Sequence, residues 1–91
     1  MKIALRLFYT GGSPFSEAAR QELKTLQARF PNVEFEIEEI DVVLNPSKAE
    51  EDGVLATPTI IKFSPSPVAK IVCDFTDLEK ALGLKRSPSR R

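Results

Sequence analysis

The stretch from Val54 to Phe63 places the strongest constraint on how this chain can fold. An apolar approach leads into Thr57-Pro58-Thr59, and a β-branched run follows. Proline has no amide hydrogen to donate to a sheet, so Pro58 belongs at the start of a strand or on an edge strand. It also favours extended backbone at Thr57. The sequence therefore predicts a strand that begins directly after Pro58.

Residues 1–30 carry the patterns of a strand followed by a helix. Side chains alternate over residues 1–10 with apolar character on both faces, which predicts a central strand. Gly11-Gly12 interrupts this pattern. Ser13-Pro14 then offers a helix N-cap and a proline at the first helical position. The helix is expected to run to residue 30 and to bury one apolar stripe, formed by Phe15, Ala19, Leu23, Leu26 and Phe30.

Residues 33–53 predict a second strand and a short helix. Apolar residues alternate with glutamates over residues 33–38, so this strand has one acidic face towards solvent. The alternation changes parity at Glu38-Glu39, where we expect a β-bulge. Asn45-Pro46 repeats the pairing of a cap with a proline and opens a helix over residues 47–52. Gly53 suits the left-handed conformation that commonly ends a helix.

The remaining residues predict a hairpin and a third helix. Residues 64–67 form a turn before a strand over residues 68–73, and residues 77–82 favour a helix that Gly83 ends. The resulting order, βαβαββα, is that of an α/β protein with a thioredoxin-like fold, which has a parallel βαβ half and a closing antiparallel hairpin. In that fold a cis Thr-Pro bond faces the loop before the first helix. We therefore expect the Thr57–Pro58 bond to be cis.

The charges divide the chain into a folded part and a tail. Residues 85–91 contain four of the thirteen basic residues and no acidic residue. Residues 1–84 hold the other nine basic residues and all thirteen acidic residues, a net charge of −4. We therefore expect one domain over residues 1–84, a solvated, disordered basic tail over residues 85–91 and no nucleic-acid binding.

The N-terminal apolar stretch does not predict a membrane or secretory segment. The sequence has no apolar run of about 20 residues, the length that spans a bilayer. Arg6 interrupts the first apolar stretch, where a signal peptide needs a continuous one. We expect no membrane association and a cytoplasmic location.

Cysteine and histidine usage excludes most catalytic and metal chemistry. The chain has no histidine, and Cys73 is its single cysteine. A Cys-x-x-Cys redox pair, an intrachain disulfide and a zinc site of cysteine and histidine therefore cannot form. Ser13 and Ser16 have no histidine to activate them and are interpreted as helix caps. Cys73 is interpreted as a small buried apolar residue. We predict no catalytic residue, cofactor or metal ligand.

A strip of four glutamates is open to more than one interpretation. Three of them share one face of the second strand, and the strip consists of Glu34, Glu36, Glu38 and Glu39. Carboxylates can hold a hard cation, but such sites usually add ligands from loops. The strip is interpreted as a solvated face, with an interaction surface for a basic partner as the alternative.

Three stretches resemble the KaiB family of circadian clock proteins. Leu7 to Pro14 is similar to the family's opening Leu-Tyr-Val-Ala-Gly-Asn-Thr-Pro. Ile40 to Thr59 is closer still to its Ile-Asp-Val-Leu-x-Asn-Pro-x-x-Ala-Glu-x-x-x-Ile-Leu-Ala-Thr-Pro-Thr. Ser66 to Asp74 matches parts of its Pro-Pro-Val-Arg-Arg-Ile-Ile-Gly-Asp. The resemblance covers about residues 3–82.

The resemblance implies a non-enzymatic adaptor. KaiB proteins bind the N-terminal ATPase ring of the hexameric ATPase KaiC, and in cyanobacteria the complex sequesters KaiA. Members exchange between a ground-state βαββααβ fold, often tetrameric, and a thioredoxin-like monomer that binds KaiC. We therefore expect a KaiC-type partner, with KaiA as a further candidate, and the ground-state fold as the structural alternative.

Differences from the family lie mainly in the half that changes fold. Gly53 stands where lysine is common, and the chain turns basic soon after Leu82 and Gly83. With Asp74, these residues are the expected determinants of the fold switch. Two folds coexist only when their free energies differ by a few kcal/mol. Because a helix is favoured over residues 77–82, we expect mainly the thioredoxin-like monomer, with a ground-state tetramer as the alternative.

Partner contacts are expected in and after the second helix and on the hairpin. From expected exposure alone, the candidates are Lys48, Glu51, Lys62 and Lys70. Three alternatives to the adaptor remain open. These are an isolated sensory domain similar to that of the kinase SasA, a stress-linked KaiB paralogue and a thioredoxin-like redox enzyme. The missing cysteine pair argues against the last of these.

Overall fold

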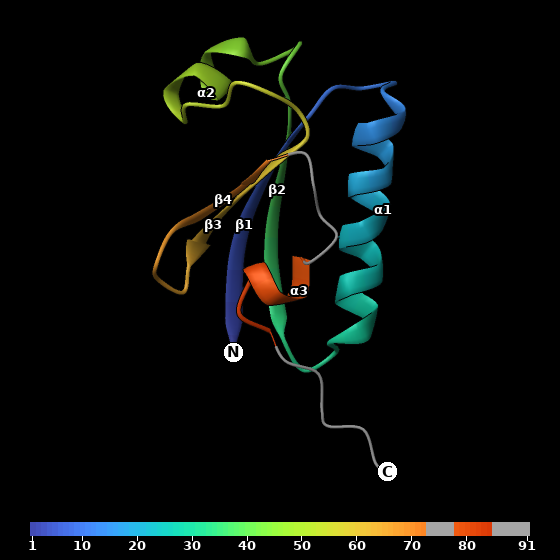
Figure 1. Ribbon diagram of the computed structural model, residues 1–91, viewed down its shortest axis with the longest axis vertical. Coiled ribbons are helices and arrows are strands. Elements are labelled where there is room, and N and C mark those ends of the chain that lie inside the picture. The colour runs from blue at the N-terminus through green and yellow to red at the C-terminus, as the bar shows by residue number, and fades with distance from the viewer. Residues whose placement is uncertain (73–77, 85–91) are drawn as a thin grey trace.

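The computed structural model describes residues 1–72 and 78–84. Strands and helices alternate in the first half, and a hairpin and a short helix complete the fold (Figure 1). The elements are β1 (Lys2–Tyr9), α1 (Pro14–Arg29), β2 (Glu34–Asp41), α2 (Pro46–Glu51), β3 (Thr59–Ser64), β4 (Ala69–Val72) and α3 (Leu78–Ala81). This βαβαββα order confirms the predicted thioredoxin-like fold and differs from the βαββααβ alternative.

The described strands form one mixed sheet in the order β2-β1-β3-β4. β1 pairs in parallel with β2 and antiparallel with β3, and β4 closes the hairpin antiparallel to β3. β1 therefore lies inside the sheet, as its two apolar faces predict. Pro58 precedes the first residue of β3, and the Thr57–Pro58 bond is cis.

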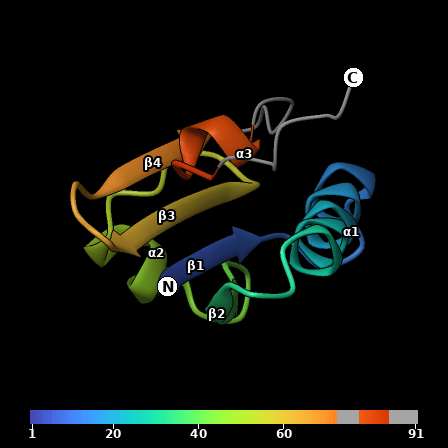
Figure 2. The same ribbon diagram turned by 90° about the horizontal axis from the view of Figure 1, so that it is seen from below.

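The sheet is covered unequally on its two faces. α1 and α3 pack on one face, while the short α2 lies on the other (Figure 2). The larger core joins β1 and β3 to these two helices through Ile3, Leu5, Leu7, Ala19, Leu23, Leu26, Ile60, Leu78, Leu82 and Leu84. The smaller core under α2 consists of Phe8, Ile40, Ala49 and Ile61. Because α2 has only six residues, it covers only one end of its face of the sheet, and no other helix of residues 1–72 and 78–84 packs there.

The buried stripe of α1 differs from the prediction at its first position. Phe15 is 77% exposed, whereas Ser16 is fully buried. Position 15 lies only about 40° from position 19 and about 20° from position 26 around the helix, at about 100° per residue, so the helical period alone places it in the stripe. It lies in the first turn of α1, where the buried residue is Ser16. Ser16 Oγ accepts a hydrogen bond from the amide of Thr10 at 2.9 Å, and Ser13 caps the helix by accepting one from the amide of Ser16. The prediction that Phe15 belongs to the core is wrong.

The acidic strand has no bulge at Glu38-Glu39. β2 pairs with β1 in continuous parallel register over its whole length. Ile40 lies on the same face as Glu38 but is buried with Phe8, because α2 covers that end of the sheet. The change of parity therefore reflects the burial of Ile40 under α2, and the prediction of a bulge is wrong. A register shift occurs instead in the pairing of β1 with β3, where Phe63 is the extra residue.

The ends of the short helices follow the sequence pattern only in part. Gly53 and Gly83 adopt positive φ angles of 68° and 77°, as expected for residues that end helices. Asn45 does not cap α2 with its side chain, and its amide group donates to the carbonyl oxygen of Asp41 instead. Cys73, Asp74 and the tail over residues 85–91 lie outside the described residues, so the expectations for them stay predictions.

Candidate functional site

The loop before α1 faces the cis Thr57–Pro58 bond, at the place where a redox thioredoxin carries its thiols. The hydroxyl oxygens of Thr10 and Thr57 lie 2.8 Å apart and share a hydrogen bond. The hydroxyls of Ser13 and Ser16 accept hydrogen bonds from the backbone. Since the sequence has no histidine, these hydroxyls lack the usual base that activates a nucleophile. In this loop the hydroxyls of Ser13 and Ser16 therefore act as acceptors for backbone amides at the start of α1.

Exposed apolar residues flank α2 at the end of the sheet where β1 ends, next to the loop before α1. Leu55 is 99% exposed after the helix, and Leu44 and Val43 are 76% and 68% exposed before it. We refer to Val43, Leu44 and Leu55 as the α2 patch. A shallow cavity of about 210 Å³ opens beside it, lined by Val42, Ala49, Val54, Leu55, Ala56 and Thr57. Apolar residues gathered on a surface in this way are typical of protein interaction sites.

A polar network holds α2 on the sheet. Arg6 donates to Asp52 at 2.6 Å and to Glu38 at 2.9 Å. Lys70 donates to the carbonyl oxygens of Asp52 and Gly53 at 3.3 and 3.2 Å. We call these residues the α2 clamp. The hydrogen bond to Asp52 raises the pKa of Arg6, burial opposes it, and Glu38 adds to the rise. Arg6 therefore stays charged, and the clamp joins β1, β2 and β4 to the end of α2.

The structure does not gather the four predicted contact residues into one site. Glu51 and Lys70 are exposed, and Lys48 is half-buried. Lys70 already donates a hydrogen bond within the α2 clamp. Lys62 is only 6% exposed. It pairs with Leu5 on the face of the sheet that α1 and α3 cover, so its expected exposure was wrong.

Sequence reasoning missed the α2 patch. A single apolar residue just before a predicted strand looks the same in the sequence whether its side chain is buried or exposed. The sequence therefore could not show that Leu55 is exposed. Of the expected fold-switch determinants, Gly53 and Gly83 end helices and Leu82 is 1% exposed in the core. Asp74 lies outside the described residues.

Residues 1–72 and 78–84 provide neither a metal-binding cluster nor a membrane-spanning helix. No group of three or more acidic, histidine or cysteine side chains is arranged to hold a metal ion in this part of the chain. Among the helices of the described residues, none is long and apolar enough to cross a bilayer.

Comparison with known proteins identifies similar sequences over most of the chain. A family model described as "KaiB domain" matches residues 6–86. The circadian clock oscillator protein KaiB of Gloeothece citriformis is 47% identical over 79 residues, which cover 86% of this chain and 74% of that protein. The protein of the same name from Synechococcus elongatus is 44% identical over 79 residues, which cover 86% of this chain and 76% of its length.

Solved structures show the same architecture. The N-terminal domain of Synechococcus elongatus SasA superposes with a TM-score of 0.73 and 23% identity, over 98% of this chain and 90% of that one. Oxidised mitochondrial thioredoxin 3 of Saccharomyces cerevisiae gives a TM-score of 0.72 and 26% identity, over 89% and 76% of the two chains. The likeness confirms the fold, while this chain lacks the pair of cysteines that thioredoxin chemistry needs.

Proposed function

This chain belongs to the KaiB family of circadian clock proteins, and we propose that it acts as a non-enzymatic adaptor that docks on the N-terminal ATPase ring of a KaiC-type hexamer. The observation that carries the docking site is the α2 patch, where Val43, Leu44 and Leu55 expose apolar side chains at one end of the sheet. The proposed contact is therefore between this patch and an apolar surface of the ring.

Two features of the patch support docking. Burial of a leucine side chain is worth about 1.5–3 kcal/mol, and Leu55 has almost its whole surface available. The α2 clamp also holds the neighbouring helix in place through Arg6 and Lys70, so little ordering is required when a partner binds. The exposed Glu51 lies at the end of the same helix, where it supplies polar contacts at the rim.

We expect Leu55→Glu to weaken binding to a KaiC-type N-terminal ring by at least tenfold, which corresponds to about 1.4 kcal/mol. The substitution removes apolar surface and places a charge in the proposed contact. Binding is measured by interferometry or calorimetry with the assembled ring, and circular dichroism checks that the variant is folded.

Val68→Glu is the matched control, because Val68 is also an exposed apolar residue, at 63%, but lies before β4 and outside the patch. It should bind like the unchanged protein. Equal losses in both variants, or no loss with Leu55→Glu, would contradict docking through the α2 patch.

We also propose that the free protein is a monomer in the thioredoxin-like arrangement. α3 is supported by the buried side chains of Leu78, Leu82 and Leu84, and by an ion pair between Arg29 and Glu79. Light scattering at micromolar concentration should give a mass close to 10.1 kDa. A particle of about four times that mass would contradict the proposal and favour the tetrameric ground-state fold.

A further inference from the structure

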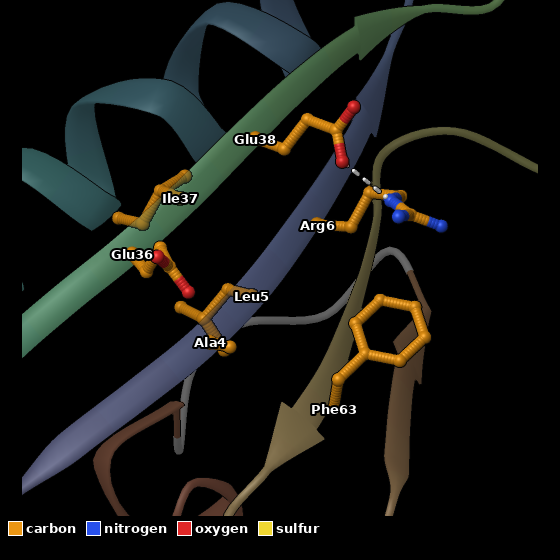
Figure 3. Close-up of a pocket in the computed structure, with 7 residues that line it drawn as sticks. All are labelled: Ala4, Leu5, Arg6, Glu36, Ile37, Glu38 and Phe63. Atoms are coloured by element: carbon orange, nitrogen blue, oxygen red, sulfur yellow. Dashed lines mark hydrogen bonds and ion pairs between the residues drawn. The ribbon is translucent and has the colours of Figure 1, made fainter.

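Phe15 is the most exposed aromatic residue in the described part of the chain. It is 77% exposed, and the next, Phe63, is 40% exposed. Phe63 is partly covered from within the chain, because the guanidinium of Arg6 lies 4.7 Å from the centroid of its ring (Figure 3). Among residues 1–72 and 78–84, no guanidinium lies over the ring of Phe15 in this way. Most of its surface is therefore available to a partner.

The position of Phe15 on α1 explains this exposure. The helical period places it about 40° from Ala19 and about 20° from Leu26, on the side of the helix that packs on the sheet. The next residue, Ser16, accepts a hydrogen bond from the amide of Thr10, which is the first residue after β1. The turn that carries Phe15 therefore lies beyond the end of β1, where this strand can no longer cover it.

Phe15 lies on the flank of α1 that is turned towards β3. Arg20, about 140° away around the helix, lies on the other flank of the buried stripe. It pairs with Glu39 of β2 at 3.0 Å. Because β2 and β3 lie on opposite sides of β1, the flank with Phe15 faces the segment that enters β3. That segment contains the cis Thr57–Pro58 bond.

The α2 patch reaches the loop between β1 and α1 on the side of this cis bond. The hydroxyls of Thr10 and Thr57 lie 2.8 Å apart, and Leu55 precedes Thr57 by two residues. Thr10 also donates its amide to Ser16, the neighbour of Phe15. Two hydrogen bonds therefore connect the segment that carries Leu55 with the turn that carries Phe15.

The other side of the α2 patch meets the same loop at its glycines. A Cβ atom at Gly11 would lie 2.8 Å from Oδ2 of Asp41, so the two backbones approach closely. Oδ1 of Asp41 in turn accepts a hydrogen bond from the amide of Val43 at 2.9 Å. Gly11 and Gly12 are both exposed, and this part of the loop adds no side chain between the patch and Phe15.

We propose that Phe15 and the α2 patch form one docking surface, in which Phe15 is an aromatic anchor for the same partner. The inference rests on the proposed function, in which this partner is the N-terminal ring of a KaiC-type hexamer. Specific interfaces bury about 800 Å² on each partner, of which three aliphatic side chains supply only a part. A buried aromatic side chain adds about 150–250 Å², and aromatic residues are enriched at interfaces. The ring therefore presents a second apolar contact beside the one that meets Leu55.

The test measures binding of the full chain to the assembled ring by interferometry. Phe15→Ala should weaken binding by about five- to tenfold, as expected for an interface anchor. Phe15→Leu keeps an apolar side chain and should retain most of the affinity. Val68→Ala is the matched control, because Val68 is 63% exposed but lies before β4 and outside this surface. It should bind like the unchanged protein.

Amide hydrogen exchange identifies the surface directly. The amides at the start of a helix have no partner within the helix, so those at the start of α1 exchange readily in the free protein. In the complex, exchange should slow over residues 11–16 as well as over residues 43–57. Protection confined to residues 43–57, or unchanged binding of Phe15→Ala, would overturn the inference. Docking through the α2 patch would still stand if Leu55→Glu weakened binding.

Two further outcomes would also overturn the inference. Loss of binding in Phe15→Ala with no loss in Leu55→Glu would show that the two residues do not share one surface, and would contradict docking through the α2 patch as well. A second copy of the chain would be the occupant if light scattering of the free protein gave a mass above 10.1 kDa that Phe15→Ala lowered. If the unchanged protein did not bind the ring, the inference and the proposed function would fail together.

Discussion

Phe8→Ala is expected to lower the free energy of unfolding by about 3–5 kcal/mol, the usual cost of replacing a buried phenylalanine with alanine. Phe8 is fully buried and is the largest side chain of the core under α2. Among the described residues, the other buried members of that core are Ile40, Ala49 and Ile61, with Val42 and Val54 packed against them, so few side chains are available to fill the cavity. Urea denaturation followed by circular dichroism measures the change.

Phe15→Ala is the matched control for this substitution. Phe15 is 77% exposed on α1, so the same change should alter the free energy of unfolding by no more than about 0.5 kcal/mol. The pair also tests the corrected stripe of α1, because the sequence pattern placed Phe15 in the core. A cost of several kcal/mol at Phe15, or a negligible cost at Phe8, would contradict the arrangement of the two faces.

Arg6→Met is expected to lower the free energy of unfolding by about 1–3 kcal/mol. The substitution keeps a long side chain but removes the donors to Asp52 and Glu38, which hold the end of α2 on the sheet. Asp52 then remains partly buried without its cation, at 21% side-chain exposure. The pKa of Arg6 is raised, so the stabilisation that its positive charge provides is fully present at acidic and neutral pH. That stabilisation is lost only at strongly alkaline pH, as the pH rises above the pKa of Arg6 in the folded protein.

Lys2→Met provides the control on the same strand. Lys2 pairs with Glu36 at 3.5 Å in an exposed position, so its loss should cost less than about 1 kcal/mol. A double-mutant cycle of Arg6→Met with Asp52→Asn should give a favourable coupling energy. Equal effects of Arg6→Met and Lys2→Met, or a coupling energy near zero, would show that the clamp does not stabilise α2.

Most of the secondary structure could be predicted from local patterns. The alternation in β1, the cap formed by Ser13 and the glycine at position 53 each depend on residues that are close in the chain. The errors arose where burial depends on distant elements. Ile40 changes parity because α2 covers one end of the sheet, and Lys62 is buried because β3 pairs with β1 beneath α1 and α3.

The candidate site was less predictable than the fold. Candidate contacts selected for charge included Lys62, which is buried, and Lys70, which hydrogen-bonds to the end of α2. The exposed apolar residues beside α2 were not selected, since an apolar residue is more often part of the core. Only the tertiary structure shows that Leu55, after α2, is 99% exposed.

The sequence by itself determined the order of elements, the absence of a Cys-x-x-Cys pair and of histidine, and the similarity to the KaiB family, because these depend on residue identity and spacing along the chain. The tertiary structure decided which apolar residues are exposed and which basic side chains form the α2 clamp. These properties arise from the pairing of segments far apart in sequence. Arg6 and Asp52, for example, are 46 residues apart and become neighbours only when α2 packs on the sheet.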